Sequence, residues 1–130
     1  MYREEMEADQ EILKPRVFKI NSSETWDSHL HQSKSHGTPI MAHFTASWCI
    51  PSVAMNPFIE QLASDFHDII FLTVDVDDFK EIAKKYEVKA MPTFLLMKGG
   101  VVVGRLVGAN PDEVKKRIET LFQYNTEFVV

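Results

Sequence analysis

Residues 44–52 read Phe-Thr-Ala-Ser-Trp-Cys-Ile-Pro-Ser and join two different hydrophobic patterns. Before them, the mostly apolar run Ile40–Thr45 is typical of a buried strand. After them, apolar residues recur at helical spacing, at Val53, Met55, Phe58, Ile59, Leu62 and Phe66. Cys49 is therefore expected where a buried strand ends and a helix begins. Pro57 is expected to bend that helix, because a proline inside a helix removes a backbone hydrogen bond.

The position of Cys49 predicts a reactive thiol. A thiol at a helix start lies near unpaired backbone N–H groups and the positive end of the helix dipole, which favour the thiolate. The thiolate is the nucleophile of disulfide exchange. An inert buried thiol is the alternative, because free cysteines are often buried. The flanking Trp48 and Pro51 favour the reactive interpretation.

Towards the N-terminus the sequence predicts a strand and a capped helix. Residues 16–20 alternate and indicate a strand, with an edge position as one option. Residues 21–23 (Asn-Ser-Ser) offer helix caps. The amphipathic stretch that follows directs Trp26 and Leu30 inward and should end by Gly37.

Towards the C-terminus the patterns predict three strands and two helices. The segments are a buried strand over 69–74, a short helix over 77–86, strands over 93–97 and 101–107 around Lys98-Gly99-Gly100, and a helix starting at Asn110-Pro111-Asp112-Glu113. The order β-α-β-α-β-α-β-β-α predicts an α/β fold. It has one central mixed sheet flanked by helices on both faces.

Composition limits the kind of protein. The chain has 130 residues, 45% of them hydrophobic, and a net charge of −5. We expect one domain over 15–124, an acidic leader over 1–14 that is polar enough to be disordered, and a tail over 125–130. The charge argues against a nucleic-acid surface. No apolar run reaches the roughly 18 residues of a membrane span, and the start lacks the apolar core of a signal peptide.

The single cysteine excludes an intrachain disulfide and suits a reducing compartment, so a cytoplasmic location is expected. No metal site or cofactor is expected. His29, His31, His36 and His67 lack the spacing of zinc ligands and are interpreted as surface residues. Asp75, Asp77 and Asp78 are interpreted as a solvated strand end and helix cap.

Several motifs occur in a fixed order: Phe-Thr-Ala-Ser-Trp-Cys-x-Pro at 44–51, Pro57, Val-Asp-Val-Asp at 74–77, Met91-Pro92-Thr93 and Gly108. Over about residues 16–122 the chain resembles the thioredoxin family, especially plant h-type thioredoxins and their relatives with a Cys-x-x-Ser site. The resemblance implies the thioredoxin fold. It also implies a cis Met91–Pro92 bond beside Cys49 and a groove in which Met91 pairs with an extended peptide.

The departures from the family are as informative as the match. Ser52 replaces the second cysteine, and Ile50 replaces a glycine. His43 replaces a buried aspartate credited with proton transfer to that cysteine, and Val53 replaces a positively charged residue. These coordinated departures suggest a natural monothiol variant. Two points stay open: whether His43 is a core histidine or an acid–base group, and whether Ser52 is a relic or donates a hydrogen bond to Cys49.

The resemblance implies a protein thiol–disulfide oxidoreductase and isomerase of the monothiol type. It would reduce weakly, isomerise better and use an external thiol such as glutathione. Its substrates would be proteins with disulfides. The residues expected to act are Cys49 and Ser52 in catalysis, and Trp48, Ile50, Pro51, Met91 and Pro92 in substrate binding. One alternative is a non-catalytic peptide-binding or holdase-like module. Another is a glutathione-assisted iron–sulfur site shared by two chains.

Overall fold

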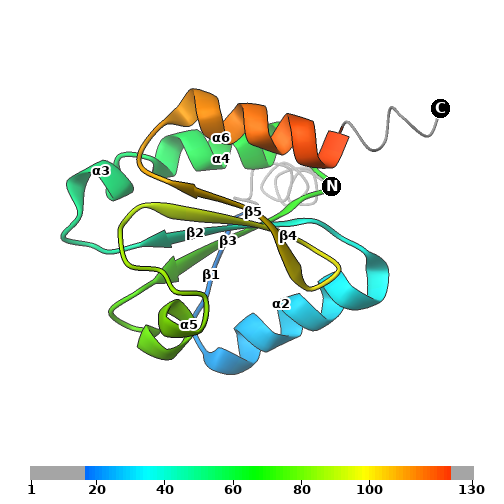
Figure 1. The fold of residues 1–130 in the computed structure, drawn as a ribbon, viewed down its shortest axis with the longest axis horizontal. Coiled ribbons are helices and arrows are strands. Elements are labelled where there is room, and N and C mark those ends of the chain that lie inside the picture. Colours follow the sequence, from blue (N-terminus) through cyan, green and yellow to red (C-terminus); the bar gives the residue numbers. More distant parts are fainter. Residues whose placement is uncertain (1–16, 124–130) are drawn as a thin grey trace, which may run out of the picture.

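The computed structural model describes residues 17–123 (Figure 1). The predicted leader over 1–14 and tail over 125–130 lie outside these residues. The elements in chain order are β1 (Val17–Lys19), α2 (Ser23–His36), β2 (Ile40–Thr45), α3 (Ile50–Val53), α4 (Asn56–Asp65), β3 (Ile70–Asp75), α5 (Lys80–Lys85), β4 (Thr93–Lys98), β5 (Val101–Val107), α6 (Pro111–Ile118) and a π-helical turn (Glu119–Gln123).

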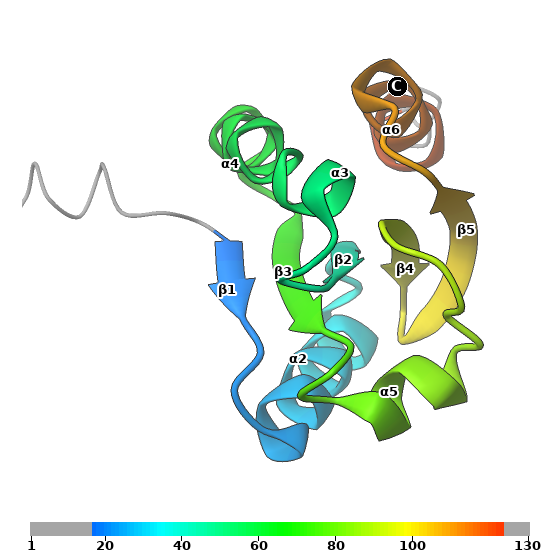
Figure 2. The same cartoon turned by 90° about the vertical axis from the view of Figure 1, so that its left-hand side faces the viewer.

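One five-stranded mixed sheet organises the fold, with strand order β1-β3-β2-β4-β5. β1 and β2 both pair with β3 in parallel, whereas β4 runs antiparallel to β2 and to β5. Helices α4 and α6 cover one face of the sheet, and α2 and α5 cover the other (Figure 2). The predicted α/β class and the helices on both faces are confirmed, and β1 is an edge strand.

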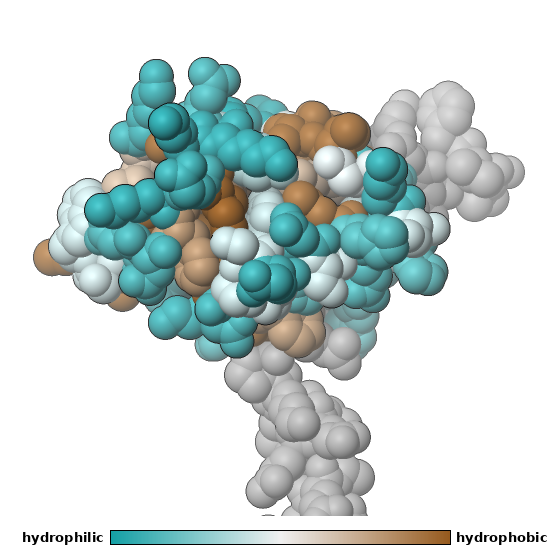
Figure 3. Space-filling view, turned by 90° about the horizontal axis from the view of Figure 1, so that it is seen from below, coloured by the Kyte–Doolittle hydropathy of each residue, from teal (hydrophilic) through white to brown (hydrophobic). Residues whose placement is uncertain are grey.

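Each face of the sheet has its own hydrophobic core, because strand side chains alternate between faces. Along β2, Met41 contributes to the core beneath α4 and α6. Ala42 and Phe44 contribute to the core beneath α2 and α5, which also contains Trp26. Figure 3 views the face that carries α2 and α5 and shows a mainly hydrophilic surface with separate hydrophobic patches.

The single bent helix predicted after Cys49 is two helices. The one-turn helix α3 ends at Val53, and α4 begins at Asn56. Pro57 lies in the first turn of α4, where its missing N–H removes no intrahelical bond, so the interruption precedes the proline. Val53 belongs to the stripe that the spacing predicts as buried, but it is 41% exposed because the break turns α3 away from the axis of α4.

The predicted short helix over 77–86 begins later than expected, at Lys80. The Asp75 carboxylate accepts hydrogen bonds from the backbone N–H groups of Asp77 and Asp78, at 2.8 and 3.2 Å. Such side-chain bonds stabilise a turn in competition with helix. Asp75 therefore shapes the turn after β3, and no side chain caps α5.

The caps predicted for two helices are confirmed. Ser22 accepts a hydrogen bond from the Thr25 N–H at the start of α2, and Gly37 ends that helix in the left-handed conformation with φ of 69°. Asn110 accepts a hydrogen bond from the Glu113 N–H at the start of α6, where Pro111 occupies the first turn.

Ser22→Ala should lower the free energy of unfolding by about 1 kcal/mol, because the Thr25 N–H loses its acceptor. Urea denaturation measures the change. Ser23→Ala is the matched control, since Ser23 is exposed and its side chain caps nothing. Equal effects of the two substitutions would contradict the assignment of Ser22 as the cap.

Candidate functional site

Cys49 lies between β2 and α3, as predicted, and is half-buried. Its N–H donates to the Ala46 carbonyl at 3.0 Å, which fixes the turn after the strand. Its Sγ lies 3.5 Å from the Met91 carbonyl oxygen, and the Met91–Pro92 peptide bond is cis. Segments 42 residues apart in the sequence therefore meet at the thiol.

The surroundings of the thiol are apolar and open to solvent. Trp48 is 63% exposed and Ile50 is 79% exposed, while Pro51 is exposed, Met91 half-buried and Pro92 buried. The Trp48 Nε1–H donates to the Asp77 carboxylate at 2.8 Å, so the indole is held against the turn after β3. Large exposed apolar side chains on both sides of a nucleophile suit contact with another protein.

Ser52 points into the protein. It is fully buried, and its Oγ donates to the Thr45 Oγ1 at 2.6 Å. Its Oγ also lies 3.2 Å from Nε2 of His43. A serine hydroxyl has one proton, which Ser52 uses on Thr45, so it accepts the His43 bond and that ring is protonated at Nε2. The structure thus shows Ser52 bonded to Thr45 and His43, in place of the hydrogen bond to Cys49 considered from the sequence.

His43 is fully buried on the α4 face of the sheet, opposite Phe44, as the alternation of the strand predicts. Its ring stacks on Phe94 with centroids 4.8 Å apart. Nδ1 has no hydrogen-bond partner among the described residues. Burial lowers the pKa of His43 to about 4, because removal from water disfavours the imidazolium form. His43 is therefore a neutral core residue that leaves one acceptor nitrogen unused.

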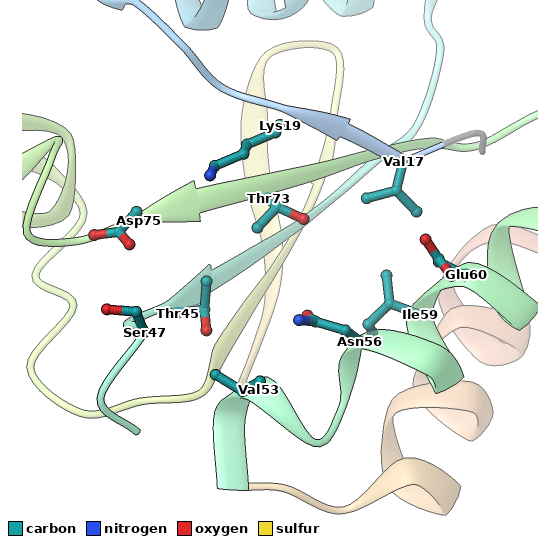
Figure 4. Close-up of a pocket in the computed structure, with 10 residues that line it drawn as sticks. All are labelled: Val17, Lys19, Thr45, Ser47, Val53, Asn56, Ile59, Glu60, Thr73 and Asp75. Carbon is teal, nitrogen blue, oxygen red and sulfur yellow. The ribbon is translucent and has the colours of Figure 1, made fainter. Parts of the chain in front are cut away.

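A cavity of about 470 Å³ adjoins this group of polar residues, between the sheet and the α3–α4 segment (Figure 4). Thr45 is one of its lining residues, so it stands between the cavity and the buried Ser52. Lys19 and Asp75 line the same cavity, from β1 and from the end of β3. The hydrogen-bonded pair of Ser52 and Thr45 thus adjoins the cavity through Thr45.

The sequence identified most of the residues that meet at the site and missed two contacts. Thr45 is two residues from His43 on β2, and this period of two could have placed both on one face. Asp77 belongs to a motif that the sequence highlighted, but its bond to Trp48 joins residues 29 positions apart, which no local pattern predicts.

No group of three or more potential metal ligands occurs within residues 17–123. The interpretation of His29 as a surface residue is wrong in part. It is half-buried beside Phe18, and burial lowers its pKa. No helix in the described part of the chain is long and apolar enough to cross a membrane.

The thioredoxin family model matches residues 17–120. The chain belongs to the thioredoxin family. It is 56% identical over 108 residues to "Thioredoxin-like protein CXXS1" of Arabidopsis thaliana, covering 83% of this chain and 92% of that protein. The rice protein of the same name is 45% identical over 115 residues, covering 88% and 86%.

Solved thioredoxins share the fold. The crystal structure of thioredoxin NaTrxh from Nicotiana alata superposes with a TM-score of 0.79 at 40% identity, covering 82% of this chain and 94% of that one. Family membership and the single cysteine support thiol–disulfide exchange as the chemistry of the site. The sequence Cys49-Ile50-Pro51-Ser52 also fits the Cys-x-x-Ser pattern in the name of the plant relatives.

Acidification should destabilise the fold through His43. The pKa of an unfolded histidine is about 6.5, whereas burial lowers the pKa of native His43 to about 4. Between these values the unfolded state binds more protons, so the free energy of unfolding falls as pH falls. From pH 7.5 to 4.5 the native chain should lose about 2 kcal/mol more than His43→Gln, measured by urea denaturation.

His31→Gln is the matched control, because His31 is exposed on α2. This variant should follow the native chain over the whole pH interval. If His43→Gln loses as much stability on acidification as the native chain, burial of neutral His43 does not set the pH dependence.

Proposed function

We propose that this chain is a monothiol oxidoreductase of protein disulfides that isomerises better than it reduces. The observation that carries the proposal is the contrast between positions 49 and 52. Cys49 is accessible beside Met91, whereas Ser52 is buried with its hydroxyl bonded to Thr45. A serine hydroxyl in that position supplies no thiolate to resolve a mixed disulfide.

The proposed isomerisation needs one sulfur on this chain. The Cys49 thiolate attacks one sulfur of a substrate disulfide, a Cys49–substrate disulfide forms, and the other substrate sulfur leaves as a thiolate. A different substrate thiolate then attacks the substrate sulfur of the mixed disulfide. This step forms a new substrate disulfide and releases Cys49 as the thiolate, so no reductant is consumed.

Net reduction needs two external thiols. One external thiol attacks the Cys49 sulfur of the mixed disulfide, releases the reduced substrate and leaves Cys49 joined to the external thiol. A second releases Cys49 and forms the external disulfide, so the electrons come entirely from outside the chain. Glutathione in the cytosol is the proposed donor, because that compartment keeps an unpaired cysteine reduced.

The proposal gives each site residue a role. Cys49 is the nucleophile, and Ser52 fixes the first turn of α3 through Thr45 and His43. The Met91 backbone would pair with an extended substrate, with Pro92 shaping the groove, since added-strand pairing is a common mode of peptide recognition. The exposed Trp48, Ile50 and Pro51 would contact the substrate from the other side.

A peptide-binding or holdase-like module is the second candidate. The exposed apolar side chains of Trp48, Ile50 and Val53 favour it, because they offer contact area that needs no thiol. The two functions differ in their dependence on the Cys49 sulfur.

A scrambled disulfide substrate should regain activity several-fold faster with this chain than without it, because Cys49 opens wrong disulfides. Cys49→Ser should remove this acceleration. Ser52→Ala should retain most of it, since the serine is not a nucleophile, while losing about 1–3 kcal/mol of stability through unpaired polar groups. If Cys49→Ser accelerates refolding as well as the native chain does, the holdase-like function is correct.

Ser52→Cys should raise the rate of insulin reduction by dithiothreitol, because a second thiol next to Cys49 can resolve the mixed disulfide. The buried position will hold the gain below the activity of a dithiol thioredoxin, because the new thiol must also replace the hydroxyl between Thr45 and His43. Ser35→Cys is the control, because Ser35 is exposed on α2, on the other face of the sheet from α4, and a thiol there does not replace Ser52. An unchanged rate in Ser52→Cys would show that the missing thiol is not what limits reduction.

A further inference from the structure

A second cavity, of about 510 Å³, borders the same residue that the thiol contacts. It lies between α5 and the segment that leads to β4, and its apolar lining is Val76, Ala83, Val88 and Met91. The carbonyl of Met91 is also the partner of the Cys49 Sγ. Helix α5 and the start of α3 lie at the same end of the sheet in both views (Figures 1 and 2). Met91 therefore adjoins both the thiol and this cavity.

The polar lining of the cavity is positive. Lys80, Lys84 and Lys89 line it together with one acid, Glu87, and all four residues are exposed. None of the three lysines forms an ion pair with a carboxylate within residues 17–123. The net charge of the whole chain is −5, so the local charge at this cavity is opposite in sign to the net charge.

The wall of the cavity is held in shape by backbone hydrogen bonds. Glu87 has φ of 55°, a conformation that non-glycine residues seldom adopt. The Val88 N–H donates to the Ala83 carbonyl at 2.8 Å, which closes the end of α5. The Arg105 guanidinium on β5 donates to the carbonyls of Tyr86 and Glu87. These three hydrogen bonds hold the strained turn at Glu87 in place. The wall of the cavity is therefore formed before any ligand binds.

We propose that this cavity, the lysine pocket, binds an acidic side chain and an adjoining apolar side chain that flank the reactive cysteine of a substrate protein. The inference rests on the proposed function, because it names the substrate class of the same thiol. The lysines attract the carboxylate, and Val76, Val88 and Met91 contact the apolar neighbour. The pocket selects acidic segments around a disulfide and disfavours basic ones.

Two synthetic peptides test the proposal. Each contains one cysteine joined to 5-thio-2-nitrobenzoate, flanked by Asp-Leu in one peptide and by Lys-Leu in the other. Attack of Cys49 on the peptide sulfur forms the protein–peptide disulfide and releases the coloured thiolate, so absorbance gives the rate constant. At low ionic strength the acidic peptide should react about tenfold faster. High salt should remove most of this difference.

Charge-reversed variants locate the source of the preference. In the double variant Lys84→Glu with Lys89→Glu, the two peptides should react at equal rates or the basic peptide should react faster. In the milder double variant Lys84→Gln with Lys89→Gln, the logarithm of the rate ratio should fall by roughly half. Lys115→Glu with Lys116→Glu is the matched control. These lysines are exposed on α6, on the opposite face of the sheet, and their reversal changes the net charge equally. The control should keep the native ratio.

The possible failures are distinguishable. If the native chain releases no more thiolate than Cys49→Ser with either peptide, the proposed function is wrong, and the selectivity fails with it. If both peptides react quickly at equal rates, only the lysine pocket is wrong. Equal shifts in the pocket and control variants would assign the preference to net charge. If the acidic peptide reacts faster only at protein concentrations where mass measurements find dimers, the pocket acts between two copies of the chain and the proposal is wrong.

Discussion

The hydrogen bond from the Ser52 hydroxyl to Thr45 ties the two elements that carry the site. Thr45 ends β2, and Ser52 belongs to the single turn of α3. That turn is too short to be stable by itself, because isolated helices need roughly three turns or more. The position of this turn therefore depends on contacts with the sheet and with the segment before β4. The hydrogen bonds of Ser52 to Thr45 and His43 are buried, and the contact of Cys49 with Met91 is partly buried. Cys49 is held just after the C-terminal end of the central strand β2 by these contacts.

The Ser52 hydroxyl also joins Thr45 to His43. A hydroxyl both donates and accepts, and a neutral imidazole protonated at Nε2 supplies the proton that the Ser52 oxygen accepts. A carboxylate in place of His43 would offer only acceptors, so the Ser52 hydroxyl would have to donate to it and accept from Thr45 instead. Serine at position 52 and histidine at position 43 are thus chemically matched. The two positions are in direct contact in the folded chain.

The sequence predicted the strands, the caps and the place of the thiol, because these depend on local alternation and on nearby backbone groups. Ser22, Asn110 and Gly37 each act within four residues of their own position. The break before α4 was misplaced, because Pro57 is compatible with either a kinked helix or a new first turn. Contacts between distant segments, such as Trp48 with Asp77 and Arg105 with the turn after α5, have no local signature. They are also the contacts that give the two sides of the site their shape.

The buried serine also bears on how the partners of this chain can be found in practice. In a dithiol protein the second thiolate can resolve the covalent complex with a substrate. Here position 52 already holds a buried hydroxyl that is hydrogen-bonded to Thr45 and His43. On the proposed chemistry, the unmodified chain is its own affinity reagent. A tagged form could be recovered from cells with its covalent clients attached, provided that small thiols are blocked at lysis.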